Sequence, residues 1–305
     1  MTTRPISQRQ LDDAKVRLQR AACASHRRGQ RVEATRNVAA LVLAALGLIV
    51  TTTGHDRALV TILGFFWFLV ASFLLRRAMS AIATQGAVLQ EQFDTALFGL
   101  PWRHSLAGDP LGEYDVARLA RKVPVGSRRD RRITAGWYAR TDGVRFPYDV
   151  FIAQEQNLAW DSRLRRTYAA VILAAAAGWI GLGLVLVGFV GGATVQQMLL
   201  SFFAPSLAAL QLAAEIWHGQ RRVADERDRL GKIVYAELRL AAPGPSNPAE
   251  VQRLTAVARD VQDGIYRTRL DVARVPEWLY RLNREADLHD FADTADNHRR
   301  RLATP

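Results

Sequence analysis

The sequence predicts a mainly α-helical membrane protein with four transmembrane helices in two helical hairpins, a helical cytoplasmic insert and a helical C-terminal region. Two observations predict this fold class. Charge-free apolar runs alternate with strongly charged segments, although the mean hydropathy of the whole chain is near zero. The stretch 168–217 holds two apolar runs, 168–190 and 193–217, which only Gly191-Gly192 separates. A spanning helix needs about 20 apolar residues to cross the hydrocarbon layer, so each run is long enough.

An earlier hairpin is predicted at 37–75. Its two runs, 37–53 and 58–75, contain no charged residue, and the break between them is only four residues long. The alternative is a helical hairpin buried inside a soluble protein. The absence of charge and the arginines that bound both runs on the same side favour the membrane.

The basic residues predict the orientation. An excess of Lys and Arg in short flanking segments marks the cytoplasmic side of a membrane protein. Four arginine clusters fall on one side of a four-span arrangement: Arg27, Arg28, Arg31 and Arg36; Arg76 and Arg77; Arg163, Arg165 and Arg166; and Arg221 and Arg222. The opposite side has only 54–57 and Gly191-Gly192, with one arginine. We therefore expect both termini in the cytoplasm and very short external loops.

This arrangement divides the chain into five segments. They are a basic N-terminal segment (1–36), transmembrane hairpin 1 (37–75), a cytoplasmic insert (76–167), transmembrane hairpin 2 (168–217) and a cytoplasmic C-terminal helical region (218–305). Helical spacing of apolar residues predicts helices in the N-terminal segment (Leu11, Leu18), at the start of the insert (Ile82, Leu89, Phe93, Leu97), at 113–122 and at 249–269 (Val251, Leu254, Val257, Val261, Ile265). Ser246 or Asn247 is expected to cap the last of these, and 125–132 is expected to be a basic loop.

Charge and composition limit the possible functions. The net charge of +12 favours an anionic partner, which could be nucleic acid, an acidic ligand or an anionic membrane surface. Cys23 is the single cysteine, so the chain can form no internal disulfide. No phosphate-binding loop, dinucleotide glycine pattern or serine nucleophile motif is present, and the histidines are scattered. We therefore expect no catalytic activity, no metal and no cofactor.

Polar groups within the second hairpin are candidates for a functional path through the membrane. Gln211 and Glu215 are four residues apart on one helix face, and Gln196 lies near the other end of the same run. An ionisable residue at membrane depth is a functional hypothesis by default. The alternative is that Glu215 lies at the membrane interface and pairs with Arg221 or Arg222.

Aromatic residues next to arginines are candidates for a ligand site. The pairs are Trp102 with Arg103, Trp137 with Arg140, and Trp160 with Arg163. Such sets can stack a base and pair with a phosphate. Alternatively, the aromatic residues form the core of a small domain and the arginines contact lipid phosphates. The residues alone favour this second interpretation and leave the ligand site open.

Three sets of motifs carry a family resemblance. They are Gln90-Glu91-Gln92-Phe93-Asp94-Thr95 followed by Phe98-Gly99-Leu100-Pro101-Trp102; Asn157-Leu158-Ala159-Trp160-Asp161-Ser162-Arg163-Leu164-Arg165-Arg166; and Val261-Gln262-Asp263-Gly264-Ile265-Tyr266-Arg267 followed by Val275-Pro276-Glu277-Trp278-Leu279-Tyr280. In this order, around four predicted spans, the sequence resembles the SMODS-associating four-transmembrane effectors of bacterial cyclic-oligonucleotide-based anti-phage signalling (CBASS).

The resemblance implies an effector of anti-phage defence in the bacterial inner membrane. It implies that a cyclic oligonucleotide made on infection binds the cytoplasmic part, and that the effector then oligomerises and disrupts or permeabilises the membrane. The expected partners are this messenger, the lipid bilayer and further copies of the chain, with no binding to nucleic-acid polymers. Two other classes stay open: a constitutive ion channel or small transporter with a regulatory cytoplasmic domain, and a membrane scaffold that recruits a partner through 249–280.

Overall fold

The computed structural model describes residues 4–53, 58–185, 194–198, 203–241, 247–271 and 275–303. Within these ranges the regular elements are all helices, as predicted. They are α1 (Ile6–Arg9), α2 (Asp13–Thr53), α3 (Ala58–Leu69), η1 (Val70–Leu75, a π-helix), α4 (Arg76–Phe98), α5 (His104–Ala107), α6 (Glu113–Ala120), α7 (Arg128–Thr134), α8 (Tyr148–Gly183), α9 (Val195–Met198), α10 (Ala204–Leu240), α11 (Pro248–Asp271) and α12 (Glu277–Leu302).

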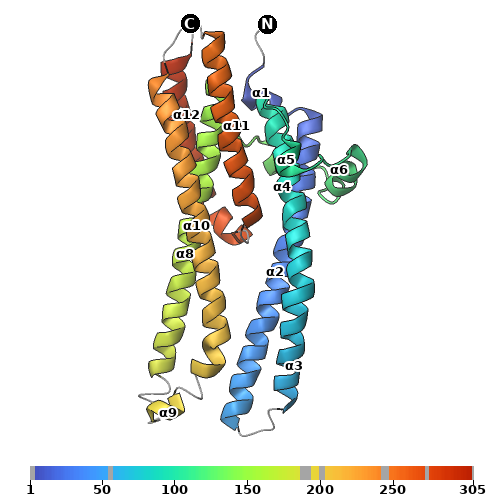
Figure 1. Ribbon diagram of the computed structural model, residues 1–305, viewed down its shortest axis with the longest axis vertical. Coiled ribbons are helices and arrows are strands. Elements are labelled where there is room, and N and C mark those ends of the chain that lie inside the picture. The colour runs from blue at the N-terminus through green and yellow to red at the C-terminus, as the bar shows by residue number, and fades with distance from the viewer. Residues whose placement is uncertain are drawn as a thin grey trace.

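Two long helical hairpins run along the length of the molecule (Figure 1). In the first, α2 packs against α3, η1 and α4, which follow one another along one rod; in the second, α8 packs against α10. The shorter helices α1, α5, α6 and α7, together with α11 and α12, gather around one end of these hairpins. We call this end the head, which comprises the described residues of 4–36, 76–167 and 218–303, and we call the opposite halves of the hairpins the apolar halves.

The apolar halves expose large hydrophobic side chains to the surroundings. Among the described residues, two helices are long and apolar enough to cross a membrane, Ile62–Phe98 and Tyr148–Gly183. None of the apolar window of the first is buried, and Phe65, Phe66 and Phe73 are all exposed. A soluble protein would bury such a helix, so this surface suits lipid. The full four-span arrangement stays a prediction, and both predicted turns, 54–57 and Gly191-Gly192, lie outside the described residues.

The N-terminal segment and the first predicted span share one helix. Helix α2 runs continuously from the head into the apolar half, across the predicted segment boundary at residue 36. Leu18 packs against the core as expected, but the expectation for Leu11 was wrong because this side chain precedes α2 and is exposed. Ile6 of α1 is buried instead and belongs to the main core, and α1 contacts α4.

The core of the head lies among α4, α8, α10 and α11. The predicted stripe on α4 is confirmed, since all four of its members are buried: Ile82, Leu89, Phe93 and Leu97. On α11, Leu254, Val261 and Ile265 are buried and Val257 packs against the same core. Asn247 caps this helix, because its Oδ1 accepts a hydrogen bond from the backbone N of Ala249 at 3.0 Å.

The prediction of a basic loop at 125–132 is wrong for its second half, because α7 begins at Arg128. Ser127 caps α7 by accepting a hydrogen bond from the backbone N of Asp130 at 3.2 Å. Asp130 in turn pairs with Arg20 of α2 at 2.6 Å and accepts from the backbone N of Gly126 at 2.7 Å. The Ser-x-x-Asp spacing is a capping signal, which the density of arginines obscured.

Candidate functional site

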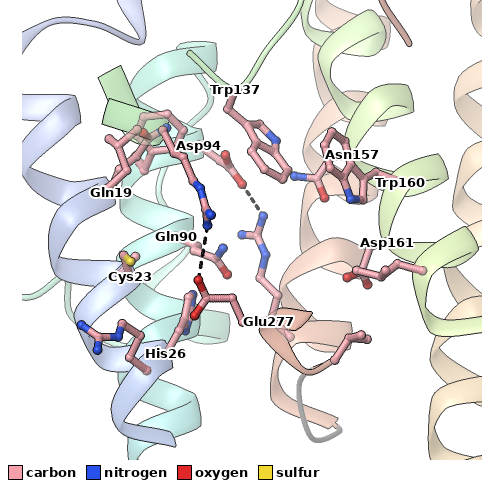
Figure 2. A pocket seen from close by; sticks show the side chains of 18 of the residues that line it. Gln19, Cys23, His26, Gln90, Asp94, Trp137, Asn157, Trp160, Asp161 and Glu277 are labelled. Atoms are coloured by element: carbon pink, nitrogen blue, oxygen red, sulfur yellow. Dashed lines mark hydrogen bonds and ion pairs between the residues drawn. The ribbon is translucent and has the colours of Figure 1, made fainter. Parts of the chain in front are cut away.

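A cavity of about 380 Å³ lies in the head, between the two hairpins (Figure 2). Its walls come from α2, α4, α7, α8, α10, α11, the segment between α7 and α8, and the start of α12. Arginines outnumber carboxylates in the lining: Arg27, Arg129, Arg132, Arg165, Arg227 and Arg269 face Asp94, Asp161 and Glu277. The cavity therefore favours an anion.

Two tryptophans form one wall of the cavity. The rings of Trp137 and Trp160 stack with centroids 4.9 Å apart and an angle of 29° between their planes. Trp160 also stacks on Phe291 of α12, with centroids 5.7 Å apart. Trp137 lies on an irregular segment between α7 and α8, and two glutamines bind its backbone. Gln10 Oε1 accepts a hydrogen bond from Trp137 N at 2.8 Å, and Gln156 Nε2 donates one to Trp137 O at 2.8 Å. These bonds satisfy buried backbone groups and fix the aromatic wall.

A buried polar network between α4 and α11 forms the second wall. Arg269 Nη2 donates to Asp94 Oδ2 at 2.5 Å, and the Tyr138 hydroxyl donates to Asp94 Oδ1 at 2.9 Å. Burial, followed by the charge of Asp94, raises the pKa of Tyr138 well above its usual value, so the hydroxyl stays a donor. Behind it, Glu91 pairs with Arg259 at 2.5 Å. Burial outweighs its arginine partners and raises the pKa of Glu91.

A second charged group lies between α8 and α10. Asp161 accepts a hydrogen bond from Arg165 Nε at 2.5 Å and forms an ion pair with Arg227 Nε at 2.8 Å. Burial, together with repulsion from Arg165 and Arg269, outweighs the attraction of Asp161 and lowers the pKa of Arg227 to about 10. Arg227 is still charged at neutral pH, so it places a buried cationic group in the cavity wall.

The structure brings together only part of the predicted ligand set. Trp137 and Trp160 line the cavity, whereas Trp102, Arg103, Arg140 and Arg163 do not. Arg103 pairs with Asp263 at 2.5 Å, Arg140 with Asp142 at 2.8 Å and Arg163 with Asp290 at 2.9 Å, and Trp102 Nε1 donates to Gly108 O at 2.9 Å.

Sequence reasoning missed the four arginines that do face the cavity from α7, α10 and α11: Arg129, Arg132, Arg227 and Arg269. The signal that could have located part of the site is the set of family motifs. Members of all three line the cavity: Asp94 of the first, Asn157, Trp160, Asp161 and Arg165 of the second, and Val275 and Glu277 of the third. Gln262 of the third binds the first motif directly, since its Nε2 donates to Glu91 Oε2 at 2.8 Å.

The polar candidates in the second hairpin lie apart from this cavity. Gln211 Nε2 donates to Glu215 Oε1 at 3.1 Å, and both side chains are exposed on α10. Gln196 is exposed on α9, at the far end of the hairpin. Among the described residues no cluster of His, Cys, Asp and Glu could hold a metal ion.

Comparison with known proteins identifies the family. The model of the SMODS-associating 4TM effector domain matches residues 4–298, which is nearly the whole chain. The chain belongs to this family. A probable CBASS effector molecule of Bacillus cereus (strain VD146) is 23% identical over 238 residues, covering 78% of this chain and 76% of that protein. No solved structure matches the chain.

Membership of the four-transmembrane effector family confirms the resemblance that the motifs predicted. It makes this chain a membrane protein of an anti-phage effector family. The exposed apolar halves of its hairpins agree with that assignment.

Proposed function

We propose that a cyclic oligonucleotide activates this effector by binding in the cavity between the two hairpins. The observation that carries the proposal is an excess of arginine beside a stacked tryptophan wall in one cavity. Arginine pairs with phosphodiester oxygens in two-pronged contacts, and nucleobases stack on aromatic rings. The cavity volume lies within the range of about 300–1,000 Å³ that small-molecule sites occupy.

The proposal extends to the membrane through the helices that build the cavity. α2, α8 and α10 each run from the head into the apolar halves without interruption among the described residues. In the proposed topology 37–75 and 168–217 cross the inner membrane twice each, and the head lies in the cytoplasm, where the messenger is made. Because four helices of one chain enclose no wide path, permeabilisation requires several copies.

A reconstitution experiment tests the proposal. Purified protein is placed in liposomes loaded with a fluorescent dye, and a panel of cyclic dinucleotides and trinucleotides is added from the side of the head. We expect leakage with at least one nucleotide and none without. The variant Arg227→Gln should leak less at the same nucleotide concentration, because it removes a buried cationic group from the cavity wall. Absence of leakage and of binding with every nucleotide would overturn the proposal.

A constitutive channel is the second candidate, and the exposed Gln211–Glu215 pair on α10 favours it. Polar side chains that face the surroundings at membrane depth are costly unless they line a path or meet a partner. Leakage that needs no nucleotide and that Glu215→Gln reduces would support the channel. Nucleotide-dependent leakage that this substitution leaves intact would exclude it.

A further inference from the structure

The first residue of α12 reaches into the cavity and pairs with two arginines. Glu277 Oε2 accepts from Arg129 Nη2 at 3.3 Å, and Glu277 Oε1 accepts from Arg132 Nη1 at 3.3 Å. Figure 2 shows Glu277 between the side chains of α2 and α4 on one side and those of α8 on the other. Burial opposes its charge, but the bonds from both arginines outweigh burial and hold the pKa of Glu277 below its usual range. At neutral pH the cavity therefore already contains an anion that belongs to the chain.

The pairing of Glu277 is the loosest of the three carboxylates in the cavity. Asp94 and Asp161 lie 2.5 Å from Arg269 and Arg165, whose side chains are buried. Glu277 is 35% exposed, and its two partners are 37% and 22% exposed. Exposed ion pairs are weak, whereas breaking a buried pair is costly. An incoming anion would therefore exchange with Glu277 before it displaced Asp94 or Asp161.

The helix that carries the two arginines is held in place without the help of Glu277. They lie three residues apart on α7, so they project from neighbouring turns of one helix face. α7 is fixed to α2 by the partly buried ion pair of Asp130 with Arg20, and Ser127 caps its start. Removing Glu277 would leave a preformed binding site, made by the two guanidinium groups, for two oxygens of one anion.

We propose that Arg129 and Arg132 form a phosphate subsite of the cavity, and that Glu277 occupies it until a phosphodiester of the ligand displaces this carboxylate. The inference rests on the proposed function for the identity of the ligand, but the subsite itself is defined by its own contacts. Guanidinium groups bind phosphate oxygens in the same two-pronged way as carboxylate oxygens, so one can replace the other on the same donors.

Displacement of Glu277 would free the start of α12. Val275 and Leu279, on either side of Glu277, are buried against Trp160, Leu164 and Tyr168 of α8. These α8 residues lie at the junction of the head with the apolar half of α8. Exchange of one anion for another would thus loosen the packing of α12 on α8 at the point where α8 leaves the head.

Three variants test the inference by nucleotide affinity. Glu277→Gln removes the internal anion with little change in shape, so the nucleotide identified by leakage should bind about five-fold more tightly, as expected for loss of a partly exposed competing charge. Arg132→Gln should weaken binding at least ten-fold. Asp290→Asn is the matched control: it removes another α12 carboxylate that pairs with an arginine, Arg163, outside the cavity, and it should change affinity less than two-fold.

Amide hydrogen exchange of the protein, measured in the presence of inorganic pyrophosphate, distinguishes failure of this inference from failure of the proposed function. We expect millimolar pyrophosphate to protect α7 and to increase exchange at 275–279 in the wild type, and to do neither in Arg132→Gln. If these changes occur but no cyclic nucleotide binds, the subsite stands and the proposed ligand is wrong. If nucleotide binds but Glu277→Gln leaves its affinity unchanged or lowers it, the displacement is wrong. A gain in affinity equal to that of Asp290→Asn would also overturn it, because loosening of α12 alone would then explain the effect.

Discussion

Replacing Arg259 by methionine should destabilise the head by about 3 kcal/mol, because this arginine joins α4 to α11 from a fully buried position. Its side chain is 2% exposed. It donates to Glu91 at 2.5 Å, to Asp263 at 2.9 Å and to the backbone O of Pro101 at 3.1 Å. Removing one partner of a buried ion pair costs about 3–5 kcal/mol, since the other charge is left without compensation.

The lower end of this range applies because both carboxylates keep other donors. Glu91 still accepts from Gln262 at 2.8 Å, and Asp263 still pairs with Arg103 at 2.5 Å. Adding Glu91→Gln to the Arg259→Met variant should recover part of the loss, because it removes one of the two stranded charges.

The assay is reversible unfolding in detergent micelles, followed by circular dichroism. Arg253→Met is the matched control on the same helix: Arg253 pairs with Glu237 at 2.7 Å, but its side chain is 55% exposed, so the loss should stay below about 1 kcal/mol. Equal losses from the two arginine variants would refute the reasoning, and so would a double variant less stable than Arg259→Met alone.

Three further predictions concern the cavity wall, the start of α8 and the packing of α11. Trp137→Leu should weaken nucleotide binding about ten-fold, as expected for loss of a stacking platform, in a fluorescence titration; unchanged affinity would mean that the base does not stack there. Burial raises the pKa of Asp149 to about 6 despite the charge of Arg9. The Asp149 carboxyl therefore stays protonated in the folded protein up to about pH 6, whereas in the unfolded chain it loses its proton near pH 3.8. The contribution of Asp149 to stability should fall as pH rises from about 4 to about 6. Asp149→Asn should flatten this part of the plot of melting temperature against pH. Gly264→Val should lower the free energy of unfolding by about 1–3 kcal/mol in the same assay, because a Cβ at this position would lie 2.7 Å from Leu230 side-chain atoms. A decrease below about 0.5 kcal/mol, which is typical of an ordinary surface substitution, would contradict the close packing.

Periodicity located the long helices and several of their buried faces before any contact was known. The stripe on α4 and most of the stripe on α11 are buried because a helix in a packed head must turn its apolar face inward. The stripe that begins at Leu11 failed because this residue precedes α2, where helical spacing no longer applies. A short pattern near a chain end fixes its first residue poorly.

The candidate site was harder to predict, because its residues meet over long separations in the chain. Asp94 binds Arg269 from 175 residues away, and Glu277 binds Arg132 from 145 residues away. Neighbours in the sequence were a poor guide: Trp137 lines the cavity, whereas Arg140, three residues on, pairs with Asp142 at the surface. The family motifs carried more information, since Glu91 and Gln262 each lie in one and bind each other.

The unbroken course of α8 sets the scale on which the head can act on the membrane. From Asn157 in the cavity wall to Gly183 the chain is one helix, with no break in its regular hydrogen bonding. At a rise of 1.5 Å per residue this stretch is about 39 Å long, so a tilt of about 5° at the cavity end would move the far end by about 3 Å. A contact rearrangement too small to change the shape of the head would thereby shift Gly183, inside the predicted span, by about half a helix radius.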